Sequence, residues 1–220
     1  MEKEERILTF IESMSAGNTV LLNEMEKKAL AEGIPIIRPQ TQSLIRFLLA
    51  AERPMRILEV GTATGFSACL MHTYAPEGAK IVTIERDQER AKRARENFAL
   101  AGAADDITLL EGDAAEILGT LKGRFDFIFM DAAKGQYIHF LPEMLRLLEL
   151  QGILLTDNIF KGGEILSSRF AVKRRDRTIH SRMREYLEAL RNNEELQTLL
   201  LQEGDGAAVS VRVKPAEDKI

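Results

Sequence analysis

Two acidic side chains and an amide follow apolar runs in the second half of the chain, where they are suited to hold a metal ion. Asp131 ends the first run, three residues before Lys134, and Asp157 and Asn158 end the second. If these runs are neighbouring parallel strands, about 4.8 Å apart, the three oxygen-bearing side chains converge on one ion. Oxygen ligands without His or Cys suit Mg²⁺ or a similar cation such as Mn²⁺, and octahedral coordination leaves about three positions for substrate oxygens and water. The alternative is that each Asp only caps the helix that follows it.

A glycine-containing loop earlier in the chain predicts a second kind of site, for a small-molecule cofactor. Gly61 and Gly65 follow the apolar run that contains Glu59, in the pattern E-x-G-x-x-x-G, and Glu85 ends the next run. Glycines after a strand let ligand atoms approach the backbone, and the following helix N-terminus offers free N–H groups. An acid at the end of the second strand can hold two ribose hydroxyls. Ala63 replaces a glycine of the dinucleotide pattern G-x-G-x-x-G, which disfavours NAD. The alternatives are that the glycine loop is only a tight turn and that Glu85 is only a surface charge, neither of which binds a ligand.

These residues need a parallel sheet to position them, and the middle of the chain has the pattern of one. Short apolar runs alternate with longer amphipathic ones from residue 56 to residue 156, which predicts strands alternating with helices that cover both faces of a sheet. The expected strands are Arg56–Val60, Lys80–Ile84, Ile107–Leu110, Phe125–Met130 and Gly152–Thr156. The expected helices between them are Phe66–Tyr74, Asp87–Leu100, Ala114–Leu121 and Tyr137–Leu148.

Both ends of the chain depart from this alternation. Helical spacing predicts one or two amphipathic helices in the first 30 residues or so, another at Gln42–Ala51, and one that closes at residues 188–193. Leu196–Leu201 and Ala207–Val213 flank a Gly-Asp-Gly turn and predict an antiparallel hairpin. We therefore divide the chain into an N-terminal helical extension (1–53), an α/β domain (54–214) and a tail (215–220).

The overall composition is that of an ordinary soluble globular protein. The 220 residues are 45% hydrophobic and 29% charged. The single cysteine, Cys69, excludes an intrachain disulfide and a cysteine-based metal cluster, which favours a reducing compartment. The first residues lack the cationic-then-apolar order of a secretion signal, and no apolar stretch approaches the ~18 residues that span a bilayer. We expect a cytoplasmic protein without a membrane segment.

Charge is distributed unevenly along the chain. Lys and Arg number 30 against 34 Asp and Glu, a formal charge of −4, which by itself argues against a general nucleic-acid binder. Residues 169–184 nevertheless hold seven Lys or Arg and one Asp, a charge of +6, so the rest of the chain carries −10. A single-sign cluster suits a polyanionic partner whose phosphates it contacts. A solvated helix face that pairs with acids of this chain or of a second subunit explains the cluster equally well.

The glycine loop and the strand-end acids resemble those of class I S-adenosylmethionine (SAM)-dependent methyltransferases. The resemblance runs from Arg56 to Val213 and includes Glu111-Gly112-Asp113-Ala114 after the third strand. It implies a Rossmann-like fold with a mostly parallel seven-stranded sheet, a C-terminal antiparallel hairpin and an N-terminal helical extension, with SAM as the cofactor. The residues that it places at the SAM site are Ile37, Glu59, Gly61, Gly65, Ser67, Glu85, Asp113, Ala114 and Asp131.

The string D-A-A-K-x-x-Y from Asp131 to Tyr137, with the later Asp157-Asn158, resembles the divalent-metal-dependent catechol and caffeoyl-CoA O-methyltransferases. This resemblance implies that Asp131, Asp157 and Asn158 bind Mg²⁺ or another divalent cation, and that Lys134 and Asp131 are catalytic. In such chemistry the metal chelates two adjacent substrate oxygens, Lys134 accepts a hydroxyl proton, and the oxygen attacks the sulfonium methyl in line. The family also implies a homodimer.

Three segments resemble bacterial tRNA 5-hydroxyuridine methyltransferases: Ile34-Pro35-Ile36-Ile37, the D-A-A-K string and the basic stretch. The acceptor implied is the 5-hydroxyl of the wobble uridine in a tRNA anticodon loop, which becomes 5-methoxyuridine; its O4 and O5 take the place of two catechol oxygens. The residues expected to contact tRNA are Arg169, Lys173, Arg174, Arg175 and Arg177. Two other interpretations stay open. One is the same chemistry on a small catechol-like or caffeoyl-type molecule, and the other is a non-catalytic RNA-binding module, which would need no metal cluster.

Overall fold

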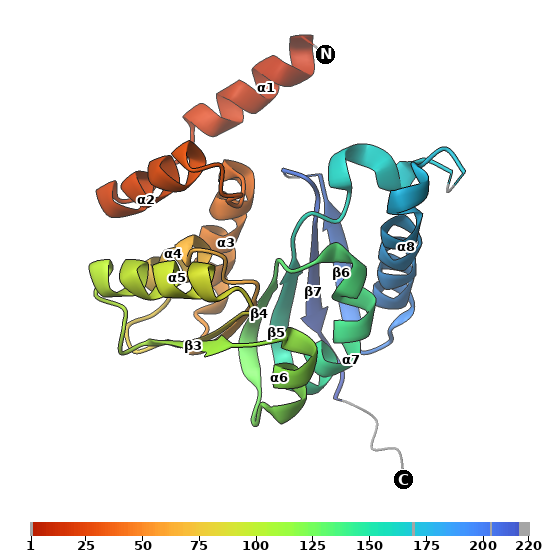
Figure 1. The fold of residues 1–220 in the computed structure, drawn as a ribbon. Coiled ribbons are helices and arrows are strands. Elements are labelled where there is room, and N and C mark those ends of the chain that lie inside the picture. Colours follow the sequence, from red (N-terminus) through yellow and green to blue (C-terminus); the bar gives the residue numbers. More distant parts are fainter. Residues whose placement is uncertain (1, 169, 203, 216–220) are drawn as a thin grey trace.

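The strands form one seven-stranded sheet (Figure 1). A computed structural model describes residues 2–168, 170–202 and 204–215. The strand order is β3-β2-β1-β4-β5-β7-β6; the first five strands are parallel, and β7 runs antiparallel to β5 and to β6. The strands are β1 (Arg56–Val60), β2 (Lys80–Glu85), β3 (Ile107–Glu111), β4 (Phe125–Met130), β5 (Leu148–Thr156), β6 (Leu196–Leu201) and β7 (Ala207–Arg212). The predicted Rossmann-like sheet with a C-terminal hairpin is confirmed.

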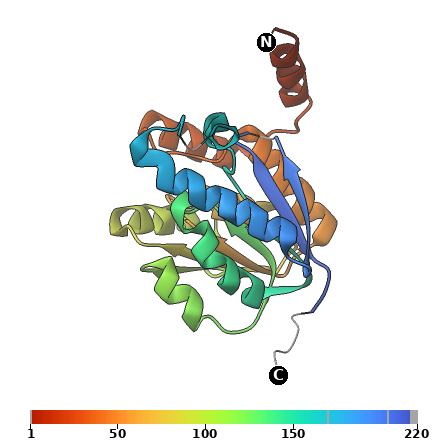
Figure 2. The same cartoon turned by 90° about the vertical axis from the view of Figure 1, so that its right-hand side faces the viewer.

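Helices cover both faces of this sheet (Figures 1 and 2). The α-helices are α1 (Glu2–Ser13), α2 (Val20–Ala31), α3 (Pro39–Glu52), α4 (Phe66–Tyr74), α5 (Gln88–Leu100), α6 (Ala114–Thr120), α7 (Tyr137–Leu147) and α8 (Arg177–Asn192). Three short 3₁₀ helices are η1 (Lys134–Gln136), η2 (Lys161–Leu166) and η3 (Arg174–Asp176). Buried side chains of α2, α3, α4 and α5 share one hydrophobic cluster, and those of α6, α7 and α8 share the other.

Strand β4 explains why the sheet is buried on both faces. Its side chains alternate: Phe127 and Phe129 belong to the cluster on the α4 side, whereas Ile128 and Met130 belong to the cluster on the α7 side. All four are fully buried. A strand with apolar, buried side chains at four successive positions cannot expose either face to water, so helices must cover both.

The register brings the carboxyl ends of the three central strands level. Val60 at the end of β1 pairs with Met130 at the end of β4, and Met130 pairs with Thr156 at the end of β5. Strands β2 and β3 lie on one side of β1, and β4 and β5 lie on the other. The topological switch point, where open α/β sheets bind ligands, is therefore between β1 and β4. The residues that follow these strands therefore lie side by side at the switch point.

The N-terminal helices differ in how they contact this body. Leu22 of α2 and Ile45 of α3 are buried in the cluster that also contains β1, so these two helices complete the core. Helix α1 instead projects away from the body (Figures 1 and 2). Its Phe10 is 64% exposed, and Met14, directly after its last residue, is 71% exposed. The part of the chain that the structure describes contains no helix with both the length and the apolar character needed to cross a membrane.

Two elements extend beyond the sequence prediction. Helix α8 begins at Arg177, inside the basic stretch, because Met183, Tyr186 and Leu190 form a buried helical stripe beneath the charged face. Strand β5 begins at Leu148 rather than at Gly152, with an irregularity in its pairing with β4. The polar residues between Leu148 and Gly152 concealed this first part of the strand.

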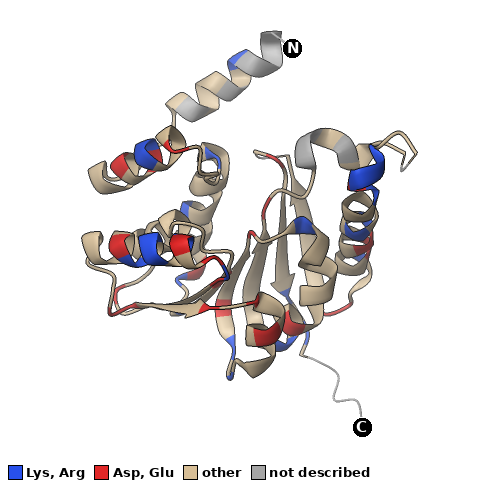
Figure 3. Cartoon of the chain, in the orientation of Figure 1, with Lys and Arg blue, Asp and Glu red and all other residues tan. Residues whose placement is uncertain are grey.

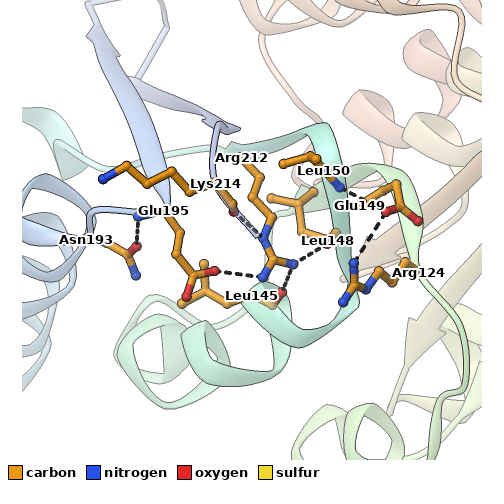
Figure 4. A network of polar contacts seen from close by, with 9 residues as sticks. All are labelled: Arg124, Leu145, Leu148, Glu149, Leu150, Asn193, Glu195, Arg212 and Lys214. Carbon is orange, nitrogen blue, oxygen red and sulfur yellow. Dashed lines mark hydrogen bonds and ion pairs between the residues drawn. The ribbon is translucent and has the colours of Figure 1, made fainter. Parts of the chain in front are cut away.

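A buried arginine ties the hairpin to the amino-terminal end of β5 (Figure 4). The Arg212 side chain is 1% exposed, and its Nη1 donates to the carbonyl oxygens of Leu145 at 2.8 Å and Leu148 at 2.7 Å. Its Nη2 forms an ion pair with Glu195 at 2.7 Å, and its Nε donates to the Lys214 carbonyl oxygen at 3.3 Å. The guanidinium therefore pairs its charge with Glu195 and donates to carbonyl oxygens at the C-terminal end of α7, where a cation is electrostatically favourable.

Candidate active site

A cleft of about 490 Å³ lies at the switch point. Its walls come from the loops after β1, β2, β3 and β4, together with α7. The predicted SAM-site residues that line it are Gly61, Glu85, Asp113, Ala114 and Asp131. The structure thus brings together residues that are up to 70 positions apart in sequence and places them around one cavity, as the glycine pattern predicted.

Two glycines shape the loop between β1 and α4. Gly61 has φ +107°, and a Cβ atom there would overlap the carbonyl oxygen of Asp131. Gly65 has φ +84° and is the N-cap of α4, where a Cβ atom would lie 2.6 Å from Cε1 of Phe98. Both positions therefore require glycine for backbone conformation and for space. The loop therefore packs closely against Asp131 and Phe98. The first turn of α4, which contains Ser67, follows the loop directly.

Glu85 is fixed by backbone N–H groups at the end of β2. Its Oε2 accepts a hydrogen bond from the Ala63 amide at 2.8 Å, and its Oε1 accepts one from the Asp87 amide at 2.9 Å. Each carboxylate oxygen keeps a second lone pair. The side chain is therefore oriented at the cleft and can still accept hydrogen bonds from a pair of hydroxyl groups.

Glu59 lies fully buried in β1 beneath the loop. Burial raises the pKa of Glu59 to about 7; hydroxyl groups of Ser67 and Thr83 oppose the rise, and the negative charge of Asp131 adds to it. The Thr83 hydroxyl donates to Oε2. Oε1 has no partner at hydrogen-bonding distance among the described residues, although Ser67 is close enough to lower the pKa. A buried acid with a spare acceptor favours a positively charged ligand in the adjacent cleft.

The three predicted metal ligands meet at the ends of β4 and β5. The Asn158 Nδ2 donates to Asp131 Oδ1 at 3.3 Å and to Asp157 Oδ2 at 3.2 Å, so one amide bridges the two carboxylates. Asn158 has φ +61°, a left-handed conformation that turns its side chain back to the two acids. The same amide can present its oxygen to a cation.

Without a cation, the charged forms of these two carboxylates are disfavoured. Burial raises the pKa of Asp157 to about 6, and the negative charge of Asp131 raises it further. Burial also raises the pKa of Asp131, against the Asn158 hydrogen bond and the positive charge of Lys134. Two carboxylates and an amide oxygen fit a hard divalent cation, which relieves their repulsion. The described residues contain no cluster of three His, Cys, Asp or Glu side chains, so Asn158 is needed to complete the set.

Two further residues support this pair. The Thr41 hydroxyl, at the start of α3, donates to Asp157 Oδ1 at 3.2 Å and is fully buried. The Tyr137 hydroxyl donates to the carbonyl oxygen of Asp157 at 3.3 Å, and its ring packs edge-to-face on Tyr186 at 5.6 Å. Tyr137 was visible in the D-A-A-K-x-x-Y string. Nothing in the sequence connects Thr41 with a residue 116 positions later.

The cleft has further walls that sequence reasoning missed. Arg86 and Arg90 line it beside Glu85, and Phe140 of α7 and Pro35 line it from other sides. Arg86 directly follows the strand-end acid, which is the signal that could have found it. The other three come from a helix interior and a loop, where no local pattern marks them.

Other predicted residues lie near the cleft without lining it. Ile37 is buried in the core, and its carbonyl oxygen accepts from Gln42 Nε2 at 2.9 Å. Lys134 begins η1, directly after the cleft residues Ala132 and Ala133, and its positive charge acts on Asp131. Helix α8 contacts this turn, because Arg182 Nη1 donates to the Gly135 carbonyl oxygen at 3.1 Å.

Lys and Arg are concentrated around the start of α8 (Figure 3), and the basic stretch divides into two groups by exposure. Lys173, Arg174 and Arg175 are exposed at the start of η3. Arg177 is half-buried, and its guanidinium donates to the carbonyl oxygens of Phe170 and Val172. Arg169 lies outside the described residues. Three of the residues predicted to contact tRNA are thus exposed to solvent, and a fourth, Arg177, is hydrogen-bonded to the protein's own backbone.

The fold and the cleft define a class of protein, the Rossmann-like SAM-dependent methyltransferases. The solved structure of the SAH-bound methyltransferase PaMTH1 from Podospora anserina superposes with a TM-score of 0.86 and 28% identity, over 97% of this chain and 96% of that one. A putative O-methyltransferase from Klebsiella pneumoniae gives a TM-score of 0.83 and 25% identity, over 94% and 96%.

Sequence comparison gives the family. The O-methyltransferase family model matches residues 12–213, and the chain belongs to this family. A catechol O-methyltransferase from Mycobacterium tuberculosis is 31% identical over 161 residues, which is 72% of this chain and 73% of that protein. One from Niastella koreensis is 32% identical over 145 residues, 63% of this chain and 66% of that protein. The predicted methyl-transfer class is confirmed.

Proposed function

We propose that this protein transfers the methyl group of SAM to a hydroxyl group that has a second oxygen beside it, with the help of a divalent cation. The observation that carries this proposal is the buried pair Asp131 and Asp157, bridged by Asn158 next to the cleft. These three residues would hold Mg²⁺ or Mn²⁺, which supplies Lewis-acid stabilisation of an ionised acceptor hydroxyl.

The remaining residues bind and orient the reactants. Glu85, held by two amides, accepts hydrogen bonds from the ribose hydroxyls of SAM. Asp113, the N-cap of α6, and the adjacent Ala114 contact the adenine end. Glu59 supplies negative charge beneath the sulfonium end. Lys134, whose positive charge acts on Asp131, would take the proton of the acceptor hydroxyl as a general base. Alignment of the acceptor oxygen with the methyl group supplies much of the acceleration.

The test of metal dependence is methyl transfer from labelled SAM to a 3,4-dihydroxy aromatic acid before and after treatment with EDTA. We expect activity to disappear with EDTA and to return with added Mg²⁺ or Mn²⁺. Activity that persists after removal of divalent cations, verified by elemental analysis, refutes the metal role.

For the acceptor, we infer 5-hydroxyuridine at the wobble position of a tRNA, which becomes 5-methoxyuridine. The support is the charge beside the cleft: Lys173, Arg174 and Arg175 are exposed, and α8, which follows them, contacts the turn after Lys134. Phosphates of an anticodon stem match such a cluster. An unpaired loop base can be splayed out into a pocket.

A small catechol-like molecule is the second candidate acceptor, favoured by relatives named catechol O-methyltransferase. The two acceptors separate in one experiment, in which tRNA that carries 5-hydroxyuridine and a series of 3,4-dihydroxy aromatics are offered in parallel. Nucleoside mass spectrometry detects 5-methoxyuridine. Methylation of the aromatics alone, with tRNA untouched, contradicts the tRNA proposal. Both substrates and SAM occur in the cytoplasm, where we place the protein.

We further propose a homodimer in which α1 packs against a second copy. Ile7, Phe10 and Ile11 of α1 and Met14 directly after it recur at helical spacing and are all 49% or more exposed, an apolar face that a monomer leaves in water. Phe10→Glu should convert a dimer to a monomer in light scattering. A wild-type protein that is monomeric at micromolar concentration refutes the proposal.

A further inference from the structure

Side chains of helix α8 bind backbone carbonyl oxygens of the segment that precedes the helix. His180 Nε2 pairs with the Ser167 carbonyl oxygen at 3.0 Å, and Arg184 Nη1 donates to the Ile165 carbonyl oxygen at 3.4 Å. Arg177 donates to two more carbonyl oxygens, of Phe170 and Val172, at 3.3 and 3.2 Å. Positions 177, 180 and 184 lie on one face of the helix, so three side chains of α8 bind the carbonyl oxygens of Ile165, Ser167, Phe170 and Val172.

This attachment leaves the large side chains of the segment facing water. Ile165 and Val172 are buried and anchor its two ends, whereas Leu166 and Phe170 are each 83% exposed. Among the described residues, Phe170 is the most exposed aromatic side chain. A peptide fixed by its carbonyls that presents a phenyl ring to solvent is suited to bind a partner through that ring.

The chemistry around the ring indicates which partner. Lys173, Arg174 and Arg175 follow within five residues and are exposed, and Arg175 pairs with Asp176 at 3.5 Å. An aromatic face among cations is the recognition surface of single-stranded nucleic acid, in which bases stack on rings while phosphates meet Lys and Arg. A membrane surface also attracts such side chains, but it has no reason to lie beside the turn that follows Lys134, which α8 contacts.

We propose that Phe170 is a stacking platform for an unpaired base of the RNA substrate, with the three neighbouring cations on the flanking phosphates. This rests on the proposed tRNA function and adds a specific contact to it. In a tRNA, the base that stacks on Phe170 is a nucleotide of the anticodon loop other than the one that enters the cleft. The Phe170 carbonyl oxygen is already hydrogen-bonded to Arg177, so less backbone conformational entropy is lost on binding.

The experiment uses the absence of tryptophan from the chain. Phe170→Trp introduces a single fluorophore at the platform. Titration with an unmodified RNA hairpin that has a single-stranded loop should quench its fluorescence, and a blunt duplex of the same composition should not. Phe170→Ala and Phe170→Leu should both weaken hairpin binding about fivefold or more, because base–aromatic stacking is lost in each. Leu166→Ala, at an equally exposed position, is the matched control and should change binding less than twofold.

The outcomes separate this contact from the function on which it rests. Wild-type affinity in Phe170→Ala and Phe170→Leu, while replacement of Lys173, Arg174 and Arg175 by Ala weakens binding, overturns the stacking contact and leaves the tRNA function standing. No hairpin binding by the wild-type protein overturns both. Loss of binding to anionic phospholipid vesicles in Phe170→Ala, but not in Phe170→Leu, with unchanged RNA binding, replaces the RNA by a membrane surface. Thermal unfolding midpoints within about 2 °C of wild type show that the variants are folded, since the ring is exposed.

Discussion

Buried charge is compensated by opposite charge and hydrogen bonds at one end of the sheet, and like charges lie close together at the other. At the amino end of β5, Arg212 is buried with an ion-pair partner and three carbonyl acceptors (Figure 4). At the carboxyl ends of β4 and β5, Asp131 and Asp157 are close together, and the negative charge of the first raises the pKa of the second. One end of the sheet is satisfied by the protein alone, whereas the other is incomplete without ligands.

This difference indicates how stability and function are divided. A buried charge with all its partners supports the fold, because the hydrogen bonds offset its desolvation. A buried pair of like charges costs stability, and proteins tolerate such a pair where a bound cation can supply the missing opposite charge. Substitutions at the two ends should therefore move stability and activity in different directions.

The largest effect is expected from Arg212→Ala. The substitution leaves Glu195 and the carbonyl groups of Leu145 and Leu148 without their donor, and breaking a buried ion pair costs about 3–5 kcal/mol. The free energy of unfolding from urea titration should fall by that amount, while kcat per folded molecule changes little. Arg124→Ala is the matched control. The Arg124–Glu149 pair lies at 3.4 Å with side chains 44% and 47% exposed, so its loss should cost about 0–1 kcal/mol. Equal losses in the two variants would contradict the comparison.

Asp157→Asn should act in the opposite sense. It keeps the shape of the side chain but removes one of two repelling charges, so the protein without a divalent cation should gain about 1 kcal/mol of stability. Methyl transfer should fall by about a hundredfold or more, since even outer-shell changes at metal sites cost tenfold to a hundredfold. Thermal unfolding with EDTA and turnover with Mg²⁺ measure the two effects. A variant that loses stability and keeps its activity shows that the pair does not hold a cation.

The sequence predicted the site better than it predicted the supports of the site. Strand-end residues such as Gly61, Glu85 and Asp131 are found from local pattern, because parallel strands bring their carboxyl ends to one place whatever connects them. Thr41 and Arg212 are not found, because Thr41 donates to a residue 116 positions away and the α7 and β5 carbonyl acceptors of Arg212 lie 67 and 64 positions away.

The same distinction holds for the fold. The apolar runs of β1 and β4 were predicted with their observed bounds, since a strand buried on both faces is apolar at most of its positions. The start of α8 was missed, because the charges of residues 173–184 dominate its sequence and the buried stripe at Met183 and Tyr186 is sparse. Which basic side chains face solvent also depends on tertiary contact, as Arg177 shows by binding loop carbonyls.

Glu59→Gln tests the incomplete end through pH. Folding raises the pKa of Glu59 from 4.5 to about 7, so the folded state holds this proton more tightly than the unfolded state. The resulting stability is complete below about pH 4.5 and is lost as pH rises through about 7. Without ligands, the free energy of unfolding should fall by about 2 kcal/mol from pH 5 to pH 8, and Glu59→Gln should remove much of this decline.

Asp157 has to be separated from Glu59 in that measurement, because its pKa is also raised, to about 6. Urea titrations of Glu59→Gln, Asp157→Asn and the double variant at several pH values apportion the decline between the two groups. An unchanged pH dependence in Glu59→Gln means that Glu59 does not titrate in this range.

The smallest effect is expected from Asp126→Asn, a control for Asp157→Asn at the other end of the sheet. Asp126 Oδ2 accepts from the backbone amides of Met55 and Arg56, both at 2.8 Å, and so fixes the start of β1 against β4. The same chemical change there weakens two charge-assisted hydrogen bonds and should cost about 1 kcal/mol of stability. Because no ligand site depends on this carboxylate, turnover should be unaffected by the substitution at a temperature well below unfolding. A loss of turnover in Asp126→Asn as large as that in Asp157→Asn would mean that charge at either end supports catalysis, and the division between the two ends would fail.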